Sequence, residues 1–112
     1  MASEPEPPYH LFLDGDEVPM TARALRLLIS DEAHEPDIRR LAREVLAELA
    51  VEPDAEGRLT VTLEPQQMKV TFSALRLLLK DLTHEQADEI EILHAILDKL
   101  PDEHTMRAIE LP

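Results

Sequence analysis

The fold of this chain is decided by a stretch that occurs twice. Residues 21–35 read TARALRLLISDEAHE and residues 71–85 read TFSALRLLLKDLTHE, so nine of fifteen positions are identical when the sequence is shifted by 50. Leu-rich helices can match by chance, but the shared Thr, Arg, Asp, His and Glu do not follow from a common apolar pattern. We therefore expect an internal repeat.

Upstream of each copy, apolar residues alternate with polar ones, which is the period of half-buried strands. Asp14-Gly15 in the first copy, and residues 64–67 in the second, supply turn sequences inside this pattern. Each copy is therefore predicted to open with a hairpin. Pro19 cannot donate a ladder hydrogen bond, so its strand is expected at an edge or a bulge. The alternating residues are Leu11, Leu13, Val18 and Met20, then Val61, Leu63, Met68 and Val70.

Downstream, each copy is predicted to form two helices. Residues 22–30 and 73–82 are dense in helix formers. Second helices are expected from Pro36 to about Ala50 and from about His84 to Leu100. Thr83 and Gln86 are spaced as a capping box for the last of these. The expected fold is α+β, with two ββαα units packed about a pseudo-twofold axis and one four-stranded sheet as an option.

A chain of 112 residues fits one domain of ordinary size. Residues 1–8, with three prolines and two glutamates, are expected to be a disordered acidic tail. The remaining domain, 9–112, is divided into repeat 1 (9–50), a linker (51–58), repeat 2 (59–100) and a short C-terminal helix (101–112).

Composition predicts a folded protein with an aliphatic core, because 44% of residues are hydrophobic while only three are aromatic. The chain has no Cys, and neither a signal peptide nor an apolar run long enough to span a bilayer is evident. We expect a cytoplasmic protein that does not contact membranes. Eight Arg against three Lys, with no Asn, suggest a GC-rich bacterial gene.

The formal net charge of −13 repels phosphate backbones, so nucleic-acid binding is not expected. With only two Gly there is no glycine-rich phosphate loop and no nucleophile elbow. The serines have no evident His partner. The sequence therefore predicts neither an enzyme nor a cofactor.

The repeated D-x-x-H-E motif has two interpretations, a metal site or the capping of a helix junction, and capping is favoured. Its weak metal candidates are Asp31, His34, Asp81 and His84. A second cluster follows helical spacing on the last long helix and is interpreted as a solvated face, although it contains a Glu-x-x-His pair. Its residues are His84, Asp88, Glu91, His94 and Asp98.

Seven residues are candidates for an interface. Arg26 and Arg76 interrupt apolar runs, either to reach an anionic group or to lie on the core with the charge in water. Leu27 and Leu77 lie about 160° around their helices from the preceding apolar face, so they belong either to the core or to a subunit contact. The third group is expected to form a salt-bridged surface; an acidic partner, or less favourably a nucleic acid, is the alternative contact. Its residues are Arg39, Arg40 and Arg43.

Residues 13–28, LDGDEVPMTARALRLL, resemble the strand-turn-strand-helix opening of winged-helix output domains in bacterial response regulators. That resemblance implies a basic recognition helix and a wing further on. The corresponding helix, residues 84–100, is acidic here, so no function is carried over.

The sequence favours a small acidic, non-catalytic module for protein–protein interaction or regulation, with a protein partner or a second copy as its ligand. One alternative is an acidic inhibitor or immunity-type protein that covers a basic site of its partner. The other is a metal-binding protein or small enzyme that uses the repeated Asp and His.

Overall fold

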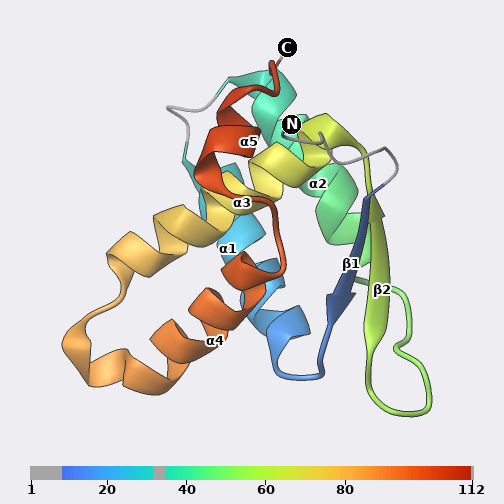
Figure 1. The fold of residues 1–112 in the computed structure, drawn as a ribbon, viewed down its shortest axis with the longest axis vertical. Helices are drawn as coiled ribbons and strands as arrows, with labels where there is room; N and C mark the ends of the chain where they lie inside the picture. Colours follow the sequence, from blue (N-terminus) through green and yellow to red (C-terminus); the bar gives the residue numbers. More distant parts are fainter. Residues whose placement is uncertain (1–8, 32–34, 112) are drawn as a thin grey trace.

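The computed structural model describes residues 9–31 and 35–111, so the tail predicted at residues 1–8 lies outside the described part. Helices make up most of the structure, and the two strands lie side by side along one edge of the molecule (Figure 1). The elements are β1 (Tyr9–Leu13), α1 (Glu17–Ser30), α2 (Pro36–Glu48), β2 (Leu59–Leu63), α3 (Pro65–Asp81), the 3-10 turn η1 (His84–Gln86), α4 (Ala87–Asp98) and α5 (Glu103–Arg107).

Each half of the chain contributes one strand, and the two predicted hairpins are wrong. β1 pairs antiparallel with β2, with Leu11 opposite Val61 and Tyr9 opposite Leu63. The sheet in the described residues therefore has two strands rather than four, and each half is a βαα unit rather than ββαα. Leu11 and Val61 are also 50 positions apart, so the strand register is symmetric about this pair.

The segments predicted as second strands are the first turns of α1 and α3. The Asp14 N–H donates to Glu17 Oε1 at 2.7 Å, and the Glu64 N–H donates to Gln67 Oε1 at 2.9 Å. These bonds start helices at the places where the hairpins were expected to turn. Pro19 lies in the first turn of α1, where its missing N–H costs no helical hydrogen bond, rather than in an edge strand.

The other helices lie close to where the sequence predicts them. α2 begins at Pro36, and α5 lies inside the predicted C-terminal helix. Thr83 and Gln86 form the predicted capping box, with the Thr83 N–H donating to Gln86 Oε1 at 3.0 Å. A 3-10 turn precedes α4, so the last long helix starts three residues later than expected.

α1 and α3 pack against each other at the centre, and both α2 and α4 contact this pair. The inward faces of the strands complete the core, while Phe12 on the outward face is 62% exposed. No helix in the described part of the chain is long and apolar enough to cross a bilayer. The largest fully buried side chains are Leu11, Leu13, Leu25, Leu28, Leu63, Met68, Leu75, Leu78, Leu93, Ile96, Met106 and Val45.

Candidate binding groove between α3 and α5

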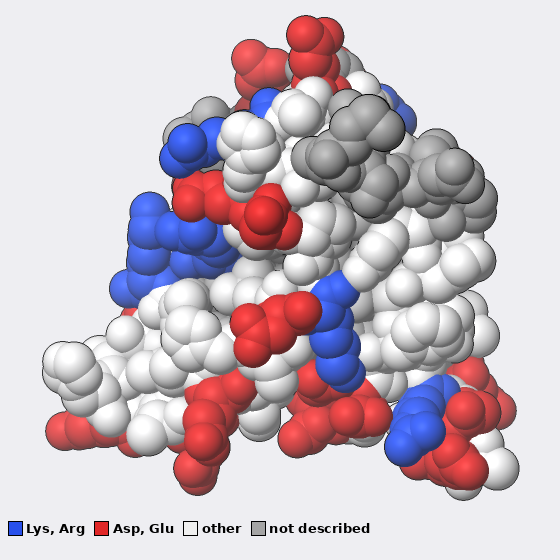
Figure 2. Space-filling view, in the orientation of Figure 1, with Lys and Arg blue, Asp and Glu red and all other residues white. Residues whose placement is uncertain are grey.

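An open groove of about 350 Å³ lies between α3 and α5. Four of its lining side chains are cationic and one is a carboxylate, although the whole chain is strongly acidic. Figure 2 shows Lys and Arg gathered at the left of the view, whereas Asp and Glu dominate the lower edge. We call this hollow the α3 groove; its lining is Lys69, Phe72, Ser73, Arg76, Leu77, Lys80, Glu103, Met106 and Arg107.

The floor of the α3 groove is one face of α3. Residues at spacings of four, three and four lie on the same side of a helix, and Lys69, Ser73, Arg76 and Lys80 follow this spacing. Phe72 and Leu77 are half-buried and lie beside this stripe. The opposite face of α3 is held in the core, so the cationic stripe is fixed toward solvent.

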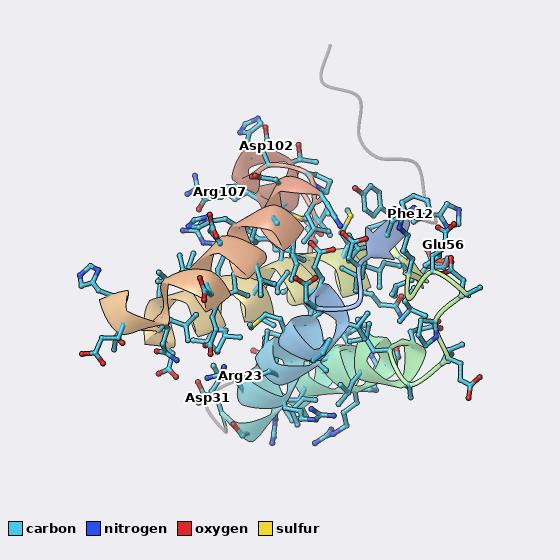
Figure 3. All side chains as sticks on the ribbon, turned by 90° about the horizontal axis from the view of Figure 1, so that it is seen from below. Phe12, Arg23, Asp31, Glu56, Asp102 and Arg107 are labelled. Atoms are coloured by element: carbon cyan, nitrogen blue, oxygen red, sulfur yellow. The ribbon has the colours of Figure 1, made fainter. Side chains whose placement is uncertain are left out.

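The C-terminal segment forms the other wall of the groove. Met106 is 2% exposed and anchors α5 to the core. Asp102 caps α5, accepting from the Thr105 N–H and from its hydroxyl, each at 2.8 Å, and these bonds lower the pKa of Asp102. Asp102 and Arg107 both lie on this wall (Figure 3). The Lys69 ammonium donates to the Ile109 carbonyl, which ties the wall to α3.

Apart from Lys69, the cations of the groove form exposed contacts or none. Glu103 lies between Arg76, at 3.6 Å, and Arg107, at 3.1 Å, and all three side chains are 44% exposed or more. Ion pairs this exposed contribute about 0–1 kcal/mol. The Arg76 guanidinium lies 5.8 Å from the centre of the Phe72 ring, a cation–π distance. Lys80 forms no ion pair or hydrogen bond with any residue that the structure describes.

A second hollow, of about 300 Å³, adjoins the first where the C-terminal ends of α1 and α3 meet. Leu27 and Leu77 line it together, and both are half-buried. We call them the leucine pair. Leu77 and Lys80 line both hollows, so the leucine pair and the α3 groove form one continuous surface.

The remaining arginine candidates lie elsewhere. Arg26 and Arg43 line a separate hollow of about 390 Å³ between α1 and α2. Arg40 pairs with Glu44 at 3.2 Å, as the helical spacing predicts. Arg39 is half-buried, and its Nε has no hydrogen-bond partner among the described residues.

The metal candidates do not form a metal site in the described residues, although two of them share one hollow. Asp31 and Asp81 lie at the hollow of the leucine pair, His84 is exposed in η1, and His34 lies outside the described residues. Within residues 9–31 and 35–111, no three His, Asp or Glu side chains are grouped so that they could hold a metal ion. The predicted stripe on α4 is exposed at each of its positions.

Sequence reasoning found Arg76, Leu27 and Leu77 but missed the other residues of this surface. The signal for Lys69 was the cationic stripe of α3, which was cut short because the helix was predicted to begin at residue 73 rather than at Pro65. Lys80 lies inside the predicted helix, on the same face as Arg76, but was not singled out. Arg107 comes from another helix, and no spacing in the sequence indicates that it joins the groove.

Comparison with known proteins does not extend this description: no family model, curated protein or solved structure matches the chain.

Proposed function

We propose that this chain is a non-catalytic protein-binding module that docks a partner protein on the α3 groove and the leucine pair. The supporting observation is the joined surface itself. Leu27, Phe72 and Leu77 are partly exposed beside the four cations of the groove, in a chain of net charge −13. Asp31 and Asp81 line the hollow of the leucine pair, at the end of this surface away from Arg107.

The composition of this surface suits a protein contact. Apolar side chains that lose their remaining exposure to water contribute about 25 cal/mol per Å² of buried area. Aromatic and Arg side chains such as Phe72 and Arg76 are the residue types that most often dominate binding energy at interfaces. Ser73 is the one hydroxyl on the described lining, and among the described residues it has no hydrogen bond to a His, Asp or Glu side chain.

Site-specific photo-crosslinking in the native host tests the proposal. A photoreactive residue at Ser73 lies in the groove, whereas one at Thr60 lies on the outward face of β2 and serves as the control. We expect a discrete protein adduct from Ser73 and none of the same mass from Thr60. Arg76→Glu should abolish the adduct, and Arg40→Glu, a matched change on α2, should leave it intact.

The proposal is contradicted if no adduct forms from the residue at position 73, or if the same adduct forms equally from position 60. An adduct of twice the chain mass would identify the partner as a second copy. Light scattering across a concentration series would then show whether that copy is bound in solution.

The inhibitor alternative is supported by a different surface. Asp14, Asp16 and Glu91 line a hollow between the start of α1 and α4. Acidic residues also dominate the lower edge of the view in Figure 2. A partner held by this surface would dissociate steeply with added salt, because exposed charges are screened beyond about 8 Å at physiological ionic strength. Crosslinking from position 91 rather than 73 would favour this alternative.

A further inference from the structure

We infer that the partner segment seated in the α3 groove is an acidic and apolar peptide stretch, whose carboxylates face the cations of α3 and α5. The inference rests on the proposed function and specifies its ligand. It follows from the charge of the groove, from a comparison of the two halves and from the apolar floor.

The charge of the groove is opposite to that of the chain. Two of the three lysines of the protein and two of its eight arginines lie in this one hollow, where Glu103 is the only carboxylate of the described lining. A neutral or basic segment that covered the groove would remove water from these cations without replacing it, which is unfavourable. Carboxylates compensate this loss, and Arg can bind them through two hydrogen bonds at once.

The first half of the chain has the same central helix without the same surface. Buried Leu25 and Leu28 of α1 correspond to buried Leu75 and Leu78 of α3. At the four positions that match the stripe, α1 has Arg23 and Arg26 but no lysine, because Pro19 and Ser30 stand where α3 has Lys69 and Lys80. Packing of such a helix therefore does not require the two lysines. Buried Ala22 of α1 stands where α3 has the half-buried Phe72.

The apolar floor argues for a peptide rather than a phosphate compound. Phe72 and Leu77 are half-buried, and buried Met106 lines the same groove from α5, so the groove offers contact area that a free phosphate would not use. A nucleic acid would have to approach a chain of net charge −13 to reach four cations. A peptide with alternating carboxylate and apolar side chains can contact both the four cations and the apolar floor of the groove.

Glu103 occupies the place that a partner carboxylate would take. Its contacts with Arg76, at 3.6 Å, and with Arg107, at 3.1 Å, are both exposed, so an incoming carboxylate can replace it at little cost. Removing this internal competitor should therefore tighten binding. Replacing a residue that merely stabilised the fold would not increase the affinity for the peptide.

Fluorescence anisotropy with the purified full chain tests the inference. The probe is a labelled peptide of 14 residues built from Glu, Asp and Leu, compared with two counterparts in which Gln and Asn, or Lys, replace the acidic residues. We expect the acidic peptide alone to bind, with amide shifts at Ser73 and Met106 in NMR spectra. Lys80→Gln should weaken binding about two- to fivefold, and Glu103→Gln should tighten it by a similar factor. Arg40→Gln is the matched control and should have no effect.

Three results would overturn the inference. The first is equal binding of the neutral or the basic peptide, and the second is weaker binding by Glu103→Gln in a variant with an unchanged circular dichroism spectrum. The third is a phosphopeptide or a single-stranded oligonucleotide that shifts the same amides at lower concentration. If the Ser73 adduct joins a basic segment of its partner, the inference fails while the proposed function stands. If no adduct forms, the proposed function fails.

Discussion

At the scale of single residues, the buried carboxylate of Glu17 links the start of α1 to the end of α4. Glu17 is 4% exposed, accepts from the Asp14 N–H at 2.7 Å and pairs with the Lys99 ammonium. The Tyr9 hydroxyl donates to the Lys99 carbonyl, and burial raises the pKa of Tyr9, which favours the protonated phenol that this bond requires. Gln67 holds the equivalent place in α3, where it accepts from a backbone N–H in the same way.

A double-mutant cycle on Glu17 and Lys99 tests this link. Glu17→Gln keeps the helix-starting bond, as Gln67 does in α3, but removes the charge, and Lys99→Met removes the cation. We expect a coupling free energy of about 1–2 kcal/mol between them, measured by urea unfolding, since hydrogen bonds to charged groups are worth more than neutral ones. If the two single substitutions change the free energy of unfolding by amounts whose sum equals the change in the double variant within about 0.3 kcal/mol, the pair does not contribute to stability.

At the scale of elements, the two strands have one buried and one exposed face. Leu11 and Val61 are each 1% exposed and stand opposite each other at the centre of the ladder. His10, Phe12, Thr60 and Thr62 point to solvent. Because side chains alternate along a strand, a shift of one residue in this register would exchange the two faces.

Alanine substitutions at neighbouring positions of β1 test the register. Leu11→Ala should lower the free energy of unfolding by about 2–4 kcal/mol, because it leaves a cavity in the core. Phe12→Ala, the matched control next to it, should change the same quantity by less than about 0.5 kcal/mol. Urea titration followed by circular dichroism measures both. A larger loss from Phe12→Ala than from Leu11→Ala would contradict the observed register.

At the scale of the whole molecule, neither half is complete without the other. β1 of the first half pairs only with β2 of the second within the described residues. The helices are shared as well: α2 packs on α3, and α4 packs on α1. Separating the halves would break the ladder between β1 and β2, leave each strand unpaired and expose one side of each central helix.

Chains that end or begin in the connection between α2 and β2 test this interdependence. Residues 9–51 and 52–112, expressed separately, should each lack a cooperative unfolding transition, because neither can cover its central helix. Mixing the two should restore helical circular dichroism and a single transition. Cooperative unfolding of either piece alone would show that the halves are independent domains.

The sequence alone determined what depends on neighbouring residues. The repeated stretch at 21–35 and 71–85 locates the two central helices, and Pro36 and the Thr83–Gln86 pair mark the starts of the second helices. Local signals sufficed because capping and helix propensity act within one or two turns.

Only the tertiary structure decided which strands pair and which cations share a groove. The alternation through Val18 and Met20 fits a short strand as well as the first turn of a helix, and the choice depends on contacts made elsewhere in the chain. Leu11 meets Val61 across 50 positions, and Arg107 reaches the α3 groove from α5. Such contacts form because distant apolar faces must be buried together, and no local pattern specifies the partner.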